Sequence, residues 1–168
     1  DGTKMFVVGN TGDDVNEYDL TTGFDVSTAA FVDAFDISNQ ETTPQGLAFN
    51  NDGTKMFVVG ATGDDVNEYT ISSGFDLSSN ITFVDSKDIS GQDTDPQGIA
   101  FNGNGTKMFV VGNADDDVNE YTLTTGFDVS SASFVDSFEI HNDQDDTPRG
   151  IAFNNDGTKM FVVGDDGN

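Results

Sequence analysis

Cysteine and tryptophan are absent from this 168-residue chain, which also has only one histidine and six basic residues. Without cysteine, the chain forms no disulfide bonds and no thiol-based catalytic or metal site, which is compatible with secretion. Its 31 acidic residues give a formal net charge of -25, which repels nucleic acid phosphates and anionic lipid surfaces. No apolar run approaches the roughly 18 residues of a membrane-spanning helix. We therefore expect no nucleic acid partner and no membrane insertion.

The remaining composition predicts a folded protein in an extracellular setting. Apolar residues make up 35% of the chain and include 15 Phe, which argues against disorder. A charge of -25 repels itself unless salt or divalent cations screen it, so it suits a salty or calcium-containing exterior better than cytosol. Acidity kept only for solubility is the alternative. The sequence shows neither a signal peptide nor an initiator Met, so we expect a mature protein or a segment of a longer one.

The chain is built from one repeated unit. The phrase GTKMFVVG occurs four times, first at residues 2–9, and alignment of its copies gives periods of 51, 52 and 52 residues. Repeats of this length are typical of propellers, solenoids or arrays. We therefore expect a single repeat domain, residues 1–168, with units 1–51, 52–103 and 104–155 and a partial unit 156–168.

Four short runs in each unit are predicted to be strands. Runs 46–50 and 55–60 flank an Asp-Gly turn, which is a strong hairpin signal. The third run, 66–71, alternates between two faces and is more polar than the second. The fourth run, 31–37 in the first unit, has Lys87 at an apolar position of the next copy, which suits a solvent-exposed edge strand. No helical period is present, so the predicted fold class is all-β.

This order of buried and exposed strands is what a four-stranded blade of a β-propeller requires. The stretch PQGLAFNNDGTKMFVVGATGDDVNEYTI, residues 44–71, resembles the blade repeat of YVTN-type and NHL-like β-propellers. In those repeats Pro-x-Gly opens the inner strand, Asp-Gly makes the first turn, and Asp-Asp or Asp-Asn precedes the third strand. The segment GFDVSTAAFVDAFDIS, residues 23–38, is similar to repeats in large surface or virion proteins of marine bacteria and phages. We predict antiparallel four-stranded propeller blades, with an open linear β array as the alternative.

Three complete units are too few to close a propeller ring, which needs about four to eight blades. We therefore predict that this chain forms part of a longer or oligomeric ring. Its partners would be further copies of the same repeat, in the same longer chain or in a homo-oligomer, because exposed strand edges pair with other strands. A surface glycan or another protein is a further expected partner.

Acidic turns between the second and third runs are the candidate metal sites. Clustered carboxylates and turn carbonyls are the oxygen ligands that calcium prefers, although no turn has the spacing of an EF-hand. The alternative is that Gly and Asp simply build these turns, with side-chain hydrogen bonds to nearby backbone amides. We expect no cofactor unless calcium binds the turns, through Asp13, Asp14, Asp64, Asp65, Asp115, Asp116 and Asp117.

The candidate binding residues lie where the loops before the inner strands converge, because ligands of propellers gather at this axial mouth. These positions differ between units, which is consistent with a binding rim, although drift in an unconstrained loop gives the same pattern. The rim residues are Thr43, Gln45, Asp95, Gln97, Thr147 and Arg149.

Two further side-chain types receive simpler interpretations. His141 lies in a loop of one unit without partners for a metal cluster or a nucleophile–base pair, so we interpret it as a solvated loop residue. The recurring Phe24, Phe75 and Phe127 are predicted to plug the space between blades rather than to stack on sugars.

Near-identical units favour a non-catalytic function, because an active site needs different groups that converge on one point. We predict a structural or binding module of a repetitive extracellular protein at a cell or virion surface, such as an adhesin, a fibre or a phage appendage, with no catalytic residues. The alternative is a calcium-dependent propeller hydrolase, similar to lactonases, with an axial site where the metal polarises the substrate.

Overall fold

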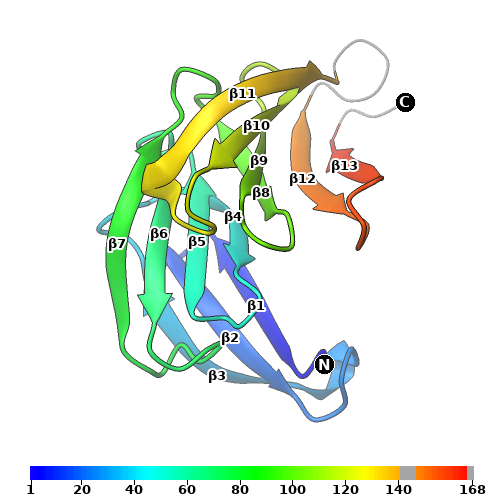
Figure 1. The fold of residues 1–168 in the computed structure, drawn as a ribbon. Coiled ribbons are helices and arrows are strands. Elements are labelled where there is room, and N and C mark those ends of the chain that lie inside the picture. The colour runs from blue at the N-terminus through cyan, green and yellow to red at the C-terminus, as the bar shows by residue number, and fades with distance from the viewer. Residues whose placement is uncertain (141–146, 166–168) are drawn as a thin grey trace.

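The chain folds into a series of antiparallel β-sheets (Figure 1). The computed structural model describes residues 1–140 and 147–165. Apart from two short 3₁₀-helices, η1 (Val26–Thr28) and η2 (Val129–Ser131), the regular elements of the described residues are strands. The strands are β1 (Lys4–Gly9), β2 (Asp14–Leu20), β3 (Ala29–Asp36), β4 (Pro44–Phe49), β5 (Lys55–Gly60), β6 (Asp65–Ile71), β7 (Ile81–Asp88), β8 (Pro96–Phe101), β9 (Lys107–Gly112), β10 (Asp117–Leu123), β11 (Ala132–Glu139), β12 (Pro148–Phe153) and β13 (Met160–Gly164).

The sheets are propeller blades, which confirms the predicted fold class. Two are complete, with strand orders β4-β5-β6-β7 and β8-β9-β10-β11. The first blade consists of β1-β2-β3 and the last of β12-β13, which correspond to the last three and the first two strands of a complete blade. Each blade therefore begins at an inner strand, whereas the sequence units that start at Asp52 and Asn104 cut the hairpin between the first two strands.

Local sequence explains why these strands turn where they do. In the first hairpin of the second blade, Gly53 adopts a φ of 70°, and its amide donates to the Asn50 carbonyl at 3.1 Å. In the next turn Asp64 has a φ of 52°, and its carbonyl accepts a hydrogen bond of 2.9 Å from the Ile89 amide. Positive φ values are reached at low cost mainly by Gly, Asn and Asp, so the Asp-Gly and Gly-Asp-Asp stretches fix these turns.

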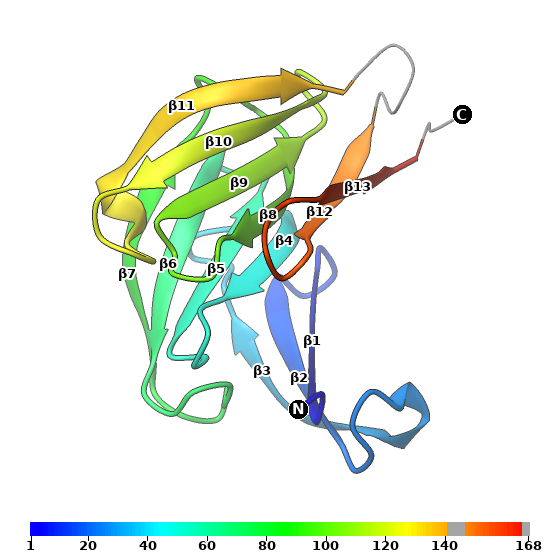
Figure 2. The ribbon, with the colours of Figure 1, turned by 45° about the vertical axis from the view of Figure 1, so that its right-hand side comes forward.

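The hydrophobic cores lie between the blades rather than inside them. Met56 and Val58 of β5 pack with Val15 of β2, whereas Phe57 and Val59, which alternate with them, pack with Met108 of the third blade. Figure 2 shows the inner strands β4, β8 and β12 close together and the sheets fanning outwards from them. Among the described residues, no helix is long and apolar enough to cross a membrane.

The third strand of a central blade is buried on both faces, which corrects the prediction of an amphipathic third strand. Val66, Asn67, Glu68 and Tyr69 of β6 are all buried. The alternation of apolar and polar residues predicted that one face of β6 would contact solvent. A central blade has a neighbouring blade on each side, so neither face of β6 is exposed to solvent at its centre. The polar side chains of β6 must therefore find partners inside the protein.

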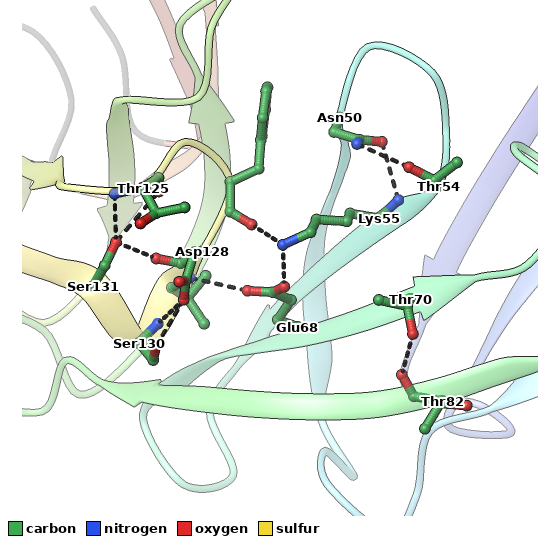
Figure 3. Close-up of polar contacts among 12 residues, drawn as sticks. Asn50, Thr54, Lys55, Glu68, Thr70, Thr82, Thr125, Asp128, Ser130 and Ser131 are labelled. Carbon is green, nitrogen blue, oxygen red and sulfur yellow. Dashed lines mark hydrogen bonds and ion pairs between the residues drawn. The ribbon is translucent and has the colours of Figure 1, made fainter.

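Glu68 is the central residue of a contact that joins neighbouring blades (Figure 3). Its side chain is only 2% exposed and pairs with Nζ of Lys55 at 2.6 Å within the same blade. Its other carboxylate oxygen accepts a hydrogen bond of 2.9 Å from the Val129 amide of the third blade. The Lys55 ammonium also donates to the Phe127 carbonyl at 2.5 Å. A buried carboxylate is costly unless it is paired, and here both blades supply the pairing groups.

The same contact joins the first blade to the second. Glu17 is fully buried, pairs with Lys4 and accepts a hydrogen bond of 2.6 Å from the Leu77 amide. In the third blade Glu120 pairs with Lys107 in the same way, but its side chain is 29% exposed. The repeat thus presents one carboxylate three times, twice in a filled interface and once at an open one.

We predict that removal of this carboxylate destabilises the protein only where the interface is filled. Glu68→Ala removes the acceptor of the buried Val129 amide and the ion-pair partner of Lys55, so it should lower the free energy of unfolding by about 3 kcal/mol. Glu120→Ala removes the same side chain from a partly exposed pair and should cost less than about 1 kcal/mol. Urea denaturation followed by circular dichroism measures both. Equal losses in the two variants would contradict this account of the interface.

Candidate functional site

The candidate site is the axial mouth, where the inner strands begin. A side chain at Gly46 would place its Cβ 2.8 Å from the Gln97 carbonyl oxygen, and one at Gly98 would lie 3.0 Å from the Arg149 carbonyl oxygen. The Pro-x-Gly motif therefore has a packing role, because Gly lets β4, β8 and β12 approach closely. The residue before each Gly is then held at the rim, and it is Gln in the second and third blades and Arg in the last.

Three of the predicted rim residues form one hydrogen-bonded chain across two blades. Nη1 of Arg149 donates to Oε1 of Gln97 at 3.1 Å, and Nε2 of Gln97 donates to Oδ1 of Asp95 at 2.6 Å. Oδ2 of Asp95 accepts from the Asn113 side chain at 3.1 Å. At the other end, Nη2 and Nε of Arg149 donate to Asp165 at 2.7 and 3.1 Å. The rim thus presents amide and guanidinium donors beside carboxylates.

Of the other predicted rim residues, Thr147 contacts Asp165 at the end of this chain, and Thr43 makes its contacts elsewhere. Thr43 donates its amide to Glu41 at 2.7 Å, and its hydroxyl lies 2.9 Å from that of Thr62. Thr147 accepts from the Asp165 amide at 3.1 Å through its hydroxyl. Gln45 is half-buried at the position equivalent to Gln97. His141 lies outside the described residues.

Two buried acids at the base of the rim loops were not predicted from the sequence. Glu41 and Asp93 occupy equivalent positions, two residues before Thr43 and Asp95, and each is buried. Both carboxylate oxygens of Glu41 are paired, since Oε1 accepts from the amide of Thr43 at 2.7 Å and Oε2 from that of Thr62 at 3.3 Å. The signal in the sequence was the acid recurring in both loops, QETT and QDTD.

Asp93 is one methylene shorter than Glu41, and its pairing is incomplete. Oδ1 accepts from the Asp95 amide at 2.6 Å, but Oδ2 has no hydrogen-bond partner within the described part of the chain. Burial raises the pKa of the Asp93 carboxyl to about 6, and the carboxylates of Asp117, Asp95 and Asp115 also raise it, whereas the Asp95 amide opposes the shift. Asp93 therefore titrates near neutral pH, directly behind the rim.

The Asp residues that were predicted as metal ligands form the acidic turns themselves. Asp13, Asp64 and Asp116 have φ values of 52°, 52° and 54° and form the turns with their backbones. The carboxylates of Asp65 and Asp117 each accept from an Asn side chain at 2.6 Å. Within residues 1–140 and 147–165, no three His, Cys, Asp or Glu side chains form a group that could hold a metal ion. Calcium binding by these turns stays a prediction.

Comparison with known proteins places the chain by its fold alone. No family model and no curated protein matches the sequence. A structure assigned as a 6-phosphogluconolactonase from Bacteroides fragilis matches with a TM-score of 0.67 at 13% identity, over 96% of this chain and 44% of the other. The periplasmic gluconolactonase PpgL of Pseudomonas aeruginosa matches with a TM-score of 0.61 at 15% identity, over 97% of this chain and 44% of the other. The hydrazine synthase of Kuenenia stuttgartiensis matches with a TM-score of 0.64 at 16% identity, over 98% of this chain and 40% of the other.

The fold is a β-propeller fold. The chain spans less than half the length of each of these three structures. The comparisons name neither YVTN-type or NHL-like proteins nor the surface and virion repeats that the sequence resembles, so those finer attributions are not supported.

The two lactonase structures contradict the prediction of a non-catalytic structural module and favour its alternative, a lactonase-like propeller. The prediction was wrong because it compared the sequences of whole units. Whole units are nearly identical because their strands must pack in the same way. The rim is a small part of each unit and differs: the position of Gln45 and Gln97 is Arg149 in the last unit, and Asp95 stands where Thr43 and Thr147 stand in the other units. Repeated units therefore do supply different groups to one mouth, and the prediction that the protein is not an enzyme is not retained.

We predict that Asp93 makes stability depend on pH. Its folded pKa of about 6 lies above its ordinary value of 3.8, so folding favours the protonated form. This contribution is fully present below about pH 3.8 and is lost as the pH rises through about 6, which costs up to about 3 kcal/mol at neutral pH. Asp93→Asn should therefore gain stability over the parent protein between about pH 4 and about pH 7. Urea denaturation across this range measures the difference, and a constant difference would contradict the prediction.

We further predict that Asp93→Glu stabilises the protein at neutral pH. The longer side chain should reach the amide of Ala114, which occupies the place of Thr62, as Glu41 reaches the Thr62 amide. One additional buried hydrogen bond to a charged group is worth about 1 to 3 kcal/mol. Glu41→Asp is the matched control, because it should recreate the incomplete pairing and lower the melting temperature. An Asp93→Glu protein that melts below its parent would contradict the comparison of the two loops.

Proposed function

We propose that this chain is part of a lactonase-like propeller hydrolase whose substrate binds at the axial mouth. The observation that carries the proposal is the chain of contacts from Arg149 through Gln97 to Asp95, because it places donors and a carboxylate from neighbouring blades in one place. The lactonase names of the two structural neighbours support the same reaction class.

The rim side chains suit the hydrolysis of a cyclic ester. Water adds to the lactone carbonyl and the ring C–O bond breaks, which gives the open hydroxy acid. Arg149 and Gln97 would donate hydrogen bonds to the carbonyl oxygen as negative charge develops on it. Asp95, which the side chains of Gln97 and Asn113 hold in place, would accept a proton from the attacking water and pass it to the ring oxygen as the C–O bond breaks.

The charge of the chain favours an uncharged sugar lactone over a phosphorylated one. A net charge of -25 repels anionic substrates, and the nearest cation, Arg149, is already paired with Asp165. We also propose a secreted or periplasmic location, because one neighbour is a periplasmic gluconolactonase and cysteine is absent. Nothing in the comparisons supports the surface or virion location expected from the sequence.

We predict that the purified chain accelerates the hydrolysis of glucono-1,5-lactone and that Arg149→Ala and Gln97→Ala each lower kcat/KM by about 100-fold, as expected for a lost transition-state donor. A pH-stat assay measures acid release against the spontaneous rate. Lys87→Ala, on the outer edge strand β7, is the control that should retain the activity. A folded chain that neither hydrolyses the lactone nor binds gluconate in a titration would overturn the proposal.

A further inference from the structure

In each of the two complete blades, one loop docks on the blade before it. The loop follows the third strand and carries the sequence Gly-Phe-Asp-Val-Ser or Gly-Phe-Asp-Leu-Ser, which we name the plug: residues 23–27, 74–78 and 126–130. The plug of the second blade is received by the first blade, and that of the third by the second. We name the receiving groove, which the preceding blade forms together with the inner strand of the plug's own blade, the socket.

Each filled socket contains the same cluster of three phenylalanine rings. At the first interface the ring centroids of Phe6 and Phe49 are 4.5 Å apart, and the plug residue Phe75 lies 6.3 Å from Phe6 and 5.5 Å from Phe49. At the second interface the equivalent distances among Phe57, Phe101 and Phe127 are 4.5, 6.2 and 5.4 Å. Two of the three rings belong to strands, and the third is always a plug.

The third interface has the first two rings and a groove where the plug would lie. Phe109 and Phe153 are 4.5 Å apart, as in the filled sockets, and no third ring joins them among the described residues. The groove that they line also contains Lys107, Glu120 and Gly157. In the filled blades a Cβ on Gly53 or Gly105 would collide with the plug Phe ring, whereas a Cβ on Gly157, with a φ of 71°, would meet no atom of the described residues within 4 Å.

The polar partners of a plug are also in place. Glu120 pairs with Lys107 as Glu68 does with Lys55, and its second carboxylate oxygen has no hydrogen-bond partner among the described residues. In both filled sockets this oxygen accepts the amide of the plug Val or Leu, and at the second interface Lys55 also donates to the Phe127 carbonyl. The groove thus offers one acceptor and one donor in the arrangement that a plug backbone satisfies.

The plug of the first blade shows that this loop keeps its shape without a socket. Phe24 has a φ of 62°, close to the 58° of Phe75 and Phe127, and its amide donates to the Gly2 carbonyl at 2.9 Å. The Asp25 carboxylate accepts from the Ser27 amide at 3.1 Å, as its equivalents do in the other plugs. Yet Phe24 is 86% exposed. A preformed loop loses little entropy on docking.

We propose that the groove between β9–β10 and β12–β13 is a docking site for the Gly-Phe-Asp-Val/Leu-Ser plug of a further copy of the repeat. The plug Phe completes the ring cluster on Phe109 and Phe153. The amide that follows the plug Asp donates to Glu120, and Lys107 donates to the Phe carbonyl. Burial of the ring supplies the main driving force, and the carboxylate fixes the register of the loop.

A capped peptide with the sequence of residues 124–132, TTGFDVSSA, tests the proposal directly. The titration uses the Phe24→Ser form of the full chain, so that its own exposed plug does not compete. Backbone NMR should show saturable shifts at Gly157, Lys107 and Glu120 with peptide concentrations up to the millimolar range. The same peptide with an N-methylated Val amide, or with Phe replaced by Ala, should bind at least about 10-fold more weakly, because each loses one of the two anchoring contacts.

Variants of the chain separate this site from other surfaces. Glu120→Ala should weaken peptide binding at least about 10-fold, because the plug amide loses its charged acceptor. Asp33→Ala, on the edge strand β3 of the first blade, should leave binding unchanged. An absence of shifts at millimolar peptide, shifts confined to the acidic turns, or equal binding by the N-methylated peptide would each overturn the proposal. These outcomes are independent of lactone hydrolysis and do not bear on the proposed function.

Discussion

The structure depends on a carboxylate that the first and second blades each bury against the blade that follows. Glu17 and Glu68 lose contact with water on folding, and each recovers its interactions from a Lys of its own blade and a backbone amide of the following blade. One of the two partners of each carboxylate therefore belongs to another blade. An isolated blade would expose the Glu–Lys pair and would leave the cluster of phenylalanine rings without its third ring. Apolar packing alone would allow neighbouring sheets to slide, whereas a buried hydrogen-bonded carboxylate has one satisfactory position. The relative placement of the blades, and hence of the inner strands, follows from this contact.

The axial mouth inherits its geometry from that placement. Gly46 and Gly98 let the inner strands approach until the backbone of one blade contacts the next, which holds Gln97 and Arg149 within hydrogen-bonding distance across the blade boundary. The rim side chains contribute little to the cores, so they can differ between blades without disturbing the packing. A rigid framework with variable loops at one end is the usual arrangement of a binding site.

The sequence predicted the features that depend on neighbouring residues, and it missed those that depend on distant ones. The Asp-Gly turn at Gly53 and the strands on either side follow from local preferences, and so does the period of the repeat. The burial of Glu68 could not be read from the alternation of β6, because its partners are Lys55, 13 residues earlier, and the Val129 amide, 61 residues later. The incomplete pairing of Asp93 could not be predicted from the sequence either. It depends on whether one additional methylene, as in Glu41, brings the carboxylate within reach of an amide in the next turn.

The pattern of differences between the units also bears on how a repeated scaffold obtains an asymmetric site. The second strands of all four units read KMFVVG, and in the two complete blades their burial between neighbouring blades explains why they cannot vary independently. The changes from Glu41 to Asp93, from Thr62 to Ala114 and from Gln97 to Arg149 all fall in loops or strand starts near the mouth. Each change leaves the cores intact but alters charge, reach or proton affinity at the rim. Asp93, with its raised pKa, and Arg149, with its donors, are therefore the points where nearly identical blades become chemically different.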